Sequence, residues 1–174
     1  MPVFTRNVVA LVTMALALGA SPLAAQTATA PAEKKVADAA KPWTTGCRGT
    51  GEAQICDAVQ SLVDEGNGKE VIRLAFAKQK TSGKIGLLIK VPLGVRLDTG
   101  ALIQIDGEPA KGIDKIVFSR CLPEGCIGEK PLVQADMDRL GKAGKVQLVF
   151  LDLEGKPIII DIVVTGLSQA LATI

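Results

Sequence analysis

Two apolar runs within residues 84–106, separated by a proline and a glycine, constrain the fold of this chain more than any other feature. The first run has an apolar residue at every second position: Ile85, Leu87, Ile89 and Val91. This period of two places all four on one face of an extended strand. The second run, residues 102–105, ends at an Asp-Gly turn. Because proline lacks an N–H and glycine packs no side chain, Pro92 and Gly94 predict a corner where the chain turns or changes sheet.

Other strand-like segments, separated by glycine-containing turns, cover most of the remaining chain. They lie at residues 43–47, 53–59, 71–78, 113–119, 146–153 and 157–165. The last two are apolar at nearly every position, which predicts central strands covered on both faces. Helical spacing of apolar residues from Pro131 to Leu140, followed by Gly141, predicts one short helix, and residues 167–171 are long enough for a final turn. The chain is therefore predicted to be all-β, an antiparallel β-sandwich or a partly closed barrel.

The N-terminal residues have the pattern of an export signal. Arg6 precedes an apolar run at residues 8–18, and small residues lead to Ala25. The run is shorter than the about 20 residues that span a bilayer, so a cleaved signal peptide is favoured over an uncleaved anchor. We expect residues 1–25 to be the signal, with Ala30 as the second choice of cleavage site. Residues 26–42, rich in Ala, Thr, Pro and Lys, are predicted to be a flexible spacer before the domain at 43–174.

The cysteine positions favour two disulfides that each close a small loop. Four cysteines allow three pairings. Cys47 and Cys56 lie on the arms of the first predicted hairpin, and Cys121 and Cys126 flank the turn at residues 122–125. In an oxidising compartment each local disulfide contributes about 2–3 kcal/mol. A zinc site of four thiolates and a redox-active pair are the alternatives, but only the second pair has knuckle spacing and neither pair is C-x-x-C.

Several kinds of chemistry have no residues to support them in this sequence. The chain contains no histidine, no phosphate-binding glycine loop and few aromatics (3%), so we expect no cofactor. The near-neutral charge gives no reason to expect nucleic acid as a partner. A Ser-Lys dyad would need a strained elbow, which none of the serines has. Four carboxylates near the central hairpin could converge on calcium or a glycosidic bond, although turn chemistry is favoured: Asp98, Asp106, Glu108 and Asp114.

One arrangement of residues resembles a known family. Trp43 and Cys47 are followed by Cys56, by KVPLGVRLDTGALIQID at 90–106, by FSRC and GC at 118–126, and by Gly-Leu-Ser after the last strand. This order resembles the invasion-associated locus B family of exported proteobacterial proteins over residues 43–170. Leu167 departs from the phenylalanine usual in that family. The resemblance implies an all-β periplasmic or surface-associated protein, linked by name to host-cell invasion and without known catalytic residues.

The sequence therefore favours a non-enzymatic binding module, periplasmic or secreted to the outer surface, with no transmembrane segment in the mature chain. Its predicted contact surface is the disulfide-closed turn Leu122, Pro123, Glu124 and Gly125, together with residues 92–100. A closed loop loses less entropy on binding a protein or envelope partner. A structural role in envelope integrity is the alternative, and an enzyme that uses the cysteines or the acidic residues is disfavoured. The oligomeric state is left open.

Overall fold

The computed structural model describes residues 39–40 and 42–174 of the chain. The predicted signal peptide, both candidate cleavage sites and the spacer up to residue 38 lie outside the described residues. Within the predicted spacer, Ala39 and Ala40 form a short strand, β1, opposite Leu62 and Val63.

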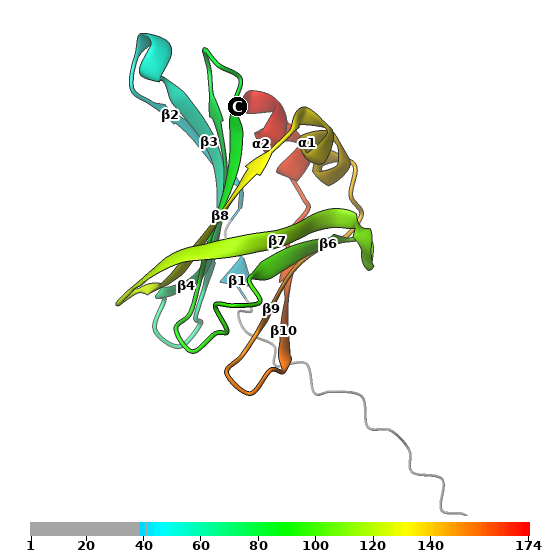
Figure 1. Cartoon of the computed structure of the whole chain (residues 1–174). Coiled ribbons are helices and arrows are strands. Elements are labelled where there is room, and N and C mark those ends of the chain that lie inside the picture. Colours follow the sequence, from blue (N-terminus) through cyan, green and yellow to red (C-terminus); the bar gives the residue numbers. More distant parts are fainter. Residues whose placement is uncertain (1–38, 41) are drawn as a thin grey trace, which may run out of the picture. The chain divides into compact units, whose positions relative to one another are not determined.

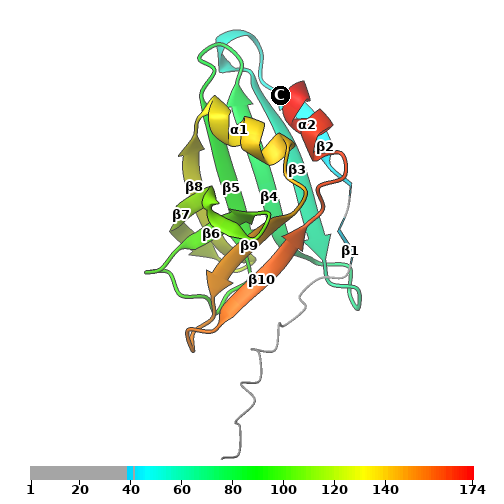
Figure 2. The ribbon, with the colours of Figure 1, turned by 90° about the vertical axis from the view of Figure 1, so that its right-hand side faces the viewer.

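The described residues form one curled antiparallel sheet with two helices (Figures 1 and 2). The strands are β1 (Ala39–Ala40), β2 (Thr44–Arg48), β3 (Ile55–Val63), β4 (Glu70–Gln79), β5 (Ile85–Val91), β6 (Ala101–Ile105), β7 (Glu108–Leu122), β8 (Gly125–Leu132), β9 (Val146–Leu151) and β10 (Pro157–Ile162). Their spatial order is β1-β3-β4-β5-β8-β7-β6-β9-β10, with β2 also paired to β3. The all-β antiparallel prediction is confirmed, in the form of a half-barrel and not of two separate sheets.

The predicted corner after Val91 is confirmed by the strand pairing. Strand β5 pairs with β4 and β8, whereas β6 pairs with β7 and β9, so residues 92–100 carry the chain from one part of the sheet to another. The long strand β7 joins the two parts, since its first half pairs with β6 and its second half with β8. Two register shifts between β6 and β7 accompany the bend.

The predicted short helix exists but begins later than expected. Helix α1 spans Gln134–Gly141, and Pro131 lies in strand β8, opposite Gly86. The boundary follows from capping, because Asp136 Oδ2 accepts a hydrogen bond from the Val133 N–H at 2.9 Å and so satisfies a free helix donor. A second helix, α2 (Leu167–Thr173), forms where the sequence predicted one helical turn.

The core lies on the inner face of the curled sheet, and both helices cover it at one end (Figure 2). In β5 the apolar residues at alternate positions are all buried, as their period of two predicts. Met137 and Leu140 of α1 and Leu167 and Leu171 of α2 complete this core. Neither helix in the described part of the chain is long and apolar enough to cross a bilayer.

The prediction that the last two strands are both central is wrong for β10. It pairs with β9 on one side, and no strand of the described chain pairs with its other side. Beyond its end, the Gln60 side chain of β3 accepts a hydrogen bond from the Val163 N–H (3.1 Å) and donates one to the Val163 carbonyl (3.3 Å). Trp43 Nε1 donates to the same carbonyl at 2.7 Å. The side chains of Gln60 and Trp43 therefore connect β3 to the residue after β10, in place of backbone hydrogen bonds between two paired strands.

Candidate interaction surface

The tip of the β7–β8 hairpin is held in place by a disulfide and by close contact with β5. Cys121 and Cys126 are directly opposite in the strand register and are bonded, with an S–S distance of 2.01 Å. Gly125 lies so near β5 that a Cβ on it would be 2.3 Å from the Val91 carbonyl oxygen. Only glycine, which has no Cβ, allows this approach. The hairpin tip is therefore in direct contact with Val91, the residue that precedes residues 92–100.

Residues 92–100 connect this tip to a second turn. The Arg96 N–H donates to the Leu151 carbonyl at 3.0 Å, and Val95 forms an isolated bridge with Asp152. The Arg96 guanidinium donates two hydrogen bonds to Asp98, at 3.1 and 2.6 Å, and these bonds lower the pKa of that carboxyl group. The segment is thus folded against the β9–β10 turn on one side and the β7–β8 tip on the other.

The β9–β10 turn at residues 152–156 has its own internal bonds. Asp152 Oδ1 accepts from the Lys156 N–H at 2.8 Å, and the Gly155 N–H donates to the Asp152 carbonyl at 3.0 Å. A carboxylate that bonds backbone groups a few residues later is a common means of ordering a turn. All three segments lie at the end of the sheet away from α1 and α2 (Figure 1).

These three segments carry four exposed leucines, which we name the leucine rim: Leu93, Leu97, Leu122 and Leu153. Their exposed fractions are 56%, 51%, 45% and 67%. A single exposed leucine is ordinary on a protein surface, but several on adjoining turns indicate a contact site. The same segments carry four acidic and two basic residues, so the surface around the leucines has a net negative charge.

The structure brings together the two segments that the sequence predicted as a contact surface. Leu122 and Gly125 of the disulfide-closed turn adjoin residues 92–100 through Val91. Sequence reasoning missed the third segment and its most exposed leucine, Leu153. The sequence did contain a signal for it, a leucine between two acidic residues at a predicted hairpin turn. Turns lie on the surface, so a leucine in that position is expected to be exposed.

The four carboxylates considered as a possible calcium or glycosidic site do not converge. Asp98, Glu108 and Asp114 each form an ion pair with a cation of their own: Arg96, Lys111 and Lys130. Asp106 instead accepts the Gly144 and Lys145 N–H groups at 2.9 and 2.8 Å. Within residues 39–40 and 42–174, no three acidic or cysteine side chains are placed to hold one metal ion. Each of the four carboxylates therefore has a local structural partner, either a nearby cation or backbone N–H groups.

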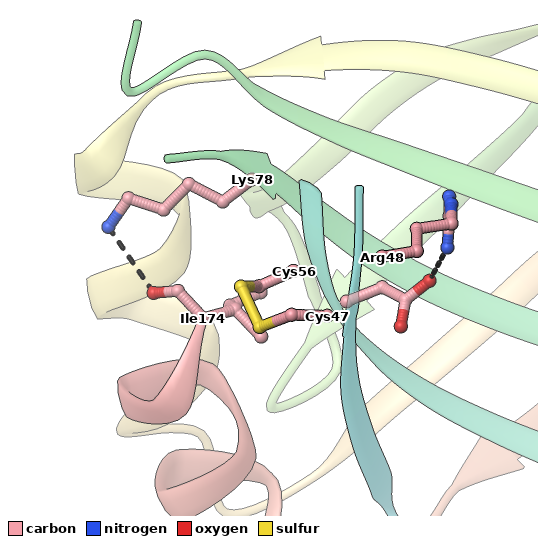
Figure 3. The surroundings of a disulfide bond; sticks show 6 residues. Cys47, Arg48, Cys56, Lys78 and Ile174 are labelled. Carbon is pink, nitrogen blue, oxygen red and sulfur yellow. Dashed lines mark hydrogen bonds and ion pairs between the residues drawn. A yellow bond between two sulfur atoms is a disulfide. The ribbon is translucent and has the colours of Figure 1, made fainter. Parts of the chain in front are cut away.

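The second disulfide, Cys47–Cys56, joins β2 to β3 near the end of α2 (Figure 3). Cys56 is opposite Lys78 of β4, whose Nζ donates to the terminal Ile174 carbonyl at 3.4 Å. Both predicted local pairings are therefore formed. Each joins two adjacent strands and closes a hairpin, which is a structural role and leaves no free cysteine in the described chain.

One partly buried carboxylate makes the stability of the sheet depend on pH. Burial raises the pKa of Glu70, but hydrogen bonds from Lys90 (2.6 Å) and Ser61, with the charges of Lys90 and Arg73, outweigh it and lower the pKa overall. A lowered pKa in the folded state stabilises the protein above the unfolded-state pKa, and this contribution is lost as pH falls through the folded-state pKa.

We therefore expect Glu70→Gln to lower the free energy of unfolding at pH 7 by about 1 kcal/mol, a modest value because the pair is partly solvated. The difference from wild type should shrink as the pH falls below the unfolded-state pKa of Glu70 and through its lower folded-state pKa. Urea unfolding at pH 7, 5 and 3 measures this, with Glu65→Gln in the exposed β3–β4 turn as control. A deficit that is the same at all three pH values would contradict the assignment to Glu70 ionisation.

Comparison with known proteins identifies what the chain is similar to. The family model described as Invasion associated locus B (IalB) protein matches residues 43–174. Invasion protein B homologs from two Brucella abortus strains, 2308 and biovar 1 strain 9-941, are each 28% identical over 85 residues. That alignment covers 49% of this chain and 47% of the relative, so the chain spans about half the length of the curated relatives it matches.

A solved structure shows the same fold. The crystal structure of invasion associated protein B from Bartonella henselae superposes with a TM-score of 0.64 over 75% of this chain and 88% of that chain. The two sequences are 18% identical over the superposed region, so this likeness supports the fold and carries no residue roles.

Proposed function

Since the chain belongs to the invasion associated locus B family, we propose that it is a non-enzymatic binding protein of the bacterial envelope that contacts a protein partner through the leucine rim. The relatives it matches are named for invasion and not for a catalysed reaction. The acidic residues that could have formed a catalytic pair are each bound to a separate partner. A contact surface is therefore the function that the geometry supports best.

The observation that carries the proposal is the exposure of all four leucines, between 45% and 67%, on three turns at the same end of the sheet. Covering a leucine side chain completely stabilises a complex by about 1.5–3 kcal/mol. Fully desolvated residues near the centre of a contact contribute most of its binding energy, while the surrounding residues exclude water. The leucine rim combines apolar side chains that a partner could cover with polar and charged residues between them.

Two features of the rim favour tight and selective binding. The Cys121–Cys126 disulfide and the Arg96–Asp98 pair hold the turns in one arrangement, so little conformational entropy is lost when a partner binds. The excess of acidic residues, among them Glu124 and Glu154, favours a partner whose apolar contact residues are flanked by lysine or arginine. It also disfavours an anionic membrane surface as the target, because like charges would face each other.

Site-specific photo-crosslinking in intact cells tests this proposal. A photoreactive residue at Leu122 and another at Leu153 should capture one common partner protein. Val133, which is 62% exposed near the start of α1 and distant from the rim, provides a matched apolar control. Partners captured equally from Val133, or different partners from Leu122 and Leu153, would contradict a single contact surface.

The captured partner then allows a quantitative prediction. Leu93→Ser combined with Leu122→Ser should weaken its binding at least tenfold, because covering the exposed halves of two leucines contributes about 1.5–3 kcal/mol in total and about 1.4 kcal/mol is a factor of ten. Because both side chains face solvent in the free protein, the thermal midpoint should be unchanged. Glu124→Lys should weaken binding of a basic partner several-fold and reduce its salt dependence. Full affinity in the double leucine variant would exclude the rim as the contact surface.

Export to the envelope is part of the same proposal and has its own test. Cell fractionation followed by N-terminal sequencing of the processed protein should place the new terminus after Ala25, or after Ala30. An unprocessed protein in the cytoplasm would remove the oxidising compartment that the two disulfides require.

A further inference from the structure

A second apolar surface lies on the outer face of the sheet, away from the core and the leucine rim. It is a groove of about 900 Å³ that crosses β3, β4, β5, β8 and β7. The apolar side chains on this outer face are Ile55, Ala77, Leu88, Val117 and Pro131, and the polar Gln79, Lys84, Ser119 and Glu129 lie at its margins. Ile85, Leu87 and Leu132 also border the groove, but their side chains are buried in the core on the opposite face. An outer strand face would ordinarily carry polar side chains, so the apolar lining is a departure that needs an occupant.

The groove exists because its floor is built from small residues. Across three neighbouring strands, Gly86 of β5 pairs with Ala77 of β4 on one side and with Pro131 of β8 on the other. The larger side chains of Leu88 and Val117 line the groove beside them. A Cβ placed on Gly86 would meet no atom within 4 Å, so open space lies directly above this residue. Val117 is 53% exposed at one wall, although it is a large apolar side chain.

The dimensions match an extended hydrocarbon chain. Five strands at a spacing of about 4.8 Å give a groove of roughly 19 Å from β3 to β7. An acyl chain in one leaflet of a bilayer extends about 15 Å, half of the hydrocarbon thickness. The volume also falls within the range of about 300–1,000 Å³ that is usual for small-molecule sites.

The charges at the margin select the head group of the occupant. Lys130 is paired with Asp114 at 2.7 Å, and Glu129 is paired with Arg120 at 3.1 Å. Lys84 also lines the groove but has no ion pair with any residue that the structure describes. An ammonium group that no described carboxylate pairs, beside an apolar groove, complements a carboxylate attached to a hydrocarbon chain.

We propose that this groove binds a long-chain fatty acid, whose carboxylate contacts Lys84 Nζ and whose chain extends from there over Gly86. A second copy of the protein fits less well, because a stable interface uses about 20–30 residues from each partner and the groove is lined by 14. The site is independent of the leucine rim and of its partner.

Titration of the purified protein with dodecanoate, dodecan-1-ol and hexanoate, followed by backbone amide NMR, tests this assignment. Dodecanoate should shift the amide signals of Ala77, Gly86 and Leu88. Hexanoate should bind at least 100-fold more weakly, because each buried methylene contributes about 0.8 kcal/mol. The neutral alcohol should bind about threefold more weakly than dodecanoate, since an exposed ion pair contributes little.

Substitutions separate the chain from the head group. Gly86→Leu should fill the groove and weaken dodecanoate binding at least tenfold, and Val117→Glu tests the same wall independently if the first variant folds poorly. Lys84→Gln should abolish the preference for dodecanoate over the alcohol. Lys80→Gln, an exposed lysine of the same β4–β5 turn that does not line the groove, should retain it.

Three outcomes would overturn the proposal. Dodecanoate could leave the groove signals unshifted, the two groove-filling variants could bind it as wild type does, or the preference for the carboxylate could survive in Lys84→Gln. A dimer seen in sedimentation velocity without fatty acid, and lost in Gly86→Leu, would assign the groove to a second copy of the chain instead.

Discussion

Replacement of Gly112 by alanine should lower the free energy of unfolding by about 4 kcal/mol or prevent folding altogether. Gly112 lies in the half of β7 that pairs with β6, next to Ile113 and within the register shift between the pairs formed by Ile103 and Ile105. A Cβ at this position would lie 1.8 Å from the Ile103 carbonyl oxygen and 2.8 Å from its carbon. Both atoms belong to the main chain, so no side chain can rotate away, and β6 and β7 would have to separate.

Gly86→Ala is the matched control, because Gly86 is also a strand glycine but has open space above it. We expect this control to change the free energy of unfolding by less than about 0.5 kcal/mol. Urea unfolding followed by circular dichroism compares both variants with wild type. If Gly112→Ala is insoluble, the yield of folded protein relative to Gly86→Ala serves as the readout. Equal stability of the two variants would show that β6 and β7 do not approach as closely as described.

Gln60→Leu should cost about 2–3 kcal/mol, although leucine has nearly the same volume and the site is buried. Gln60 is fully buried and is the one buried polar side chain among the described residues. Its amide bonds both backbone groups of Val163, which follows the edge strand β10. Leucine would leave the Val163 N–H without a partner, and Trp43 alone would bond the carbonyl. We therefore expect the two ends of the sheet to separate locally.

Chemical denaturation gives the stability change, and hydrogen exchange shows where it acts. The Val163 amide should exchange at least tenfold faster in Gln60→Leu than in wild type, because it loses its acceptor. Gln147→Leu removes an exposed amide that donates to Asp161 at 2.7 Å and should cost less than about 0.5 kcal/mol. Unchanged protection of Val163 in Gln60→Leu would show that this side chain does not join β3 to β10.

The candidate contact surface was only partly predictable from the sequence. The disulfide-closed turn at Leu122–Gly125 and the segment at 92–100 could be named from turn residues and cysteine spacing. That they adjoin depends on Val91 and Gly125, which belong to neighbouring strands 34 positions apart in the chain. Leu153 joined the surface only through the pairing of β9 with β6 and the contact of Arg96 with Leu151. The outer groove was not predicted, because residues from five different strands form it.

The sequence by itself determined the strand segments, the corner after Val91, the two disulfides and the turns. These depend on residues that are close along the chain, where the period of two, the missing N–H of proline and the length of a loop act directly. Tertiary structure alone decided that β10 is an edge strand, that Pro131 extends β8 and that side chains close the ends of the sheet. Apolar content shows that a strand is buried but not which strand lies beside it, because lateral order depends on contacts between residues far apart in the chain.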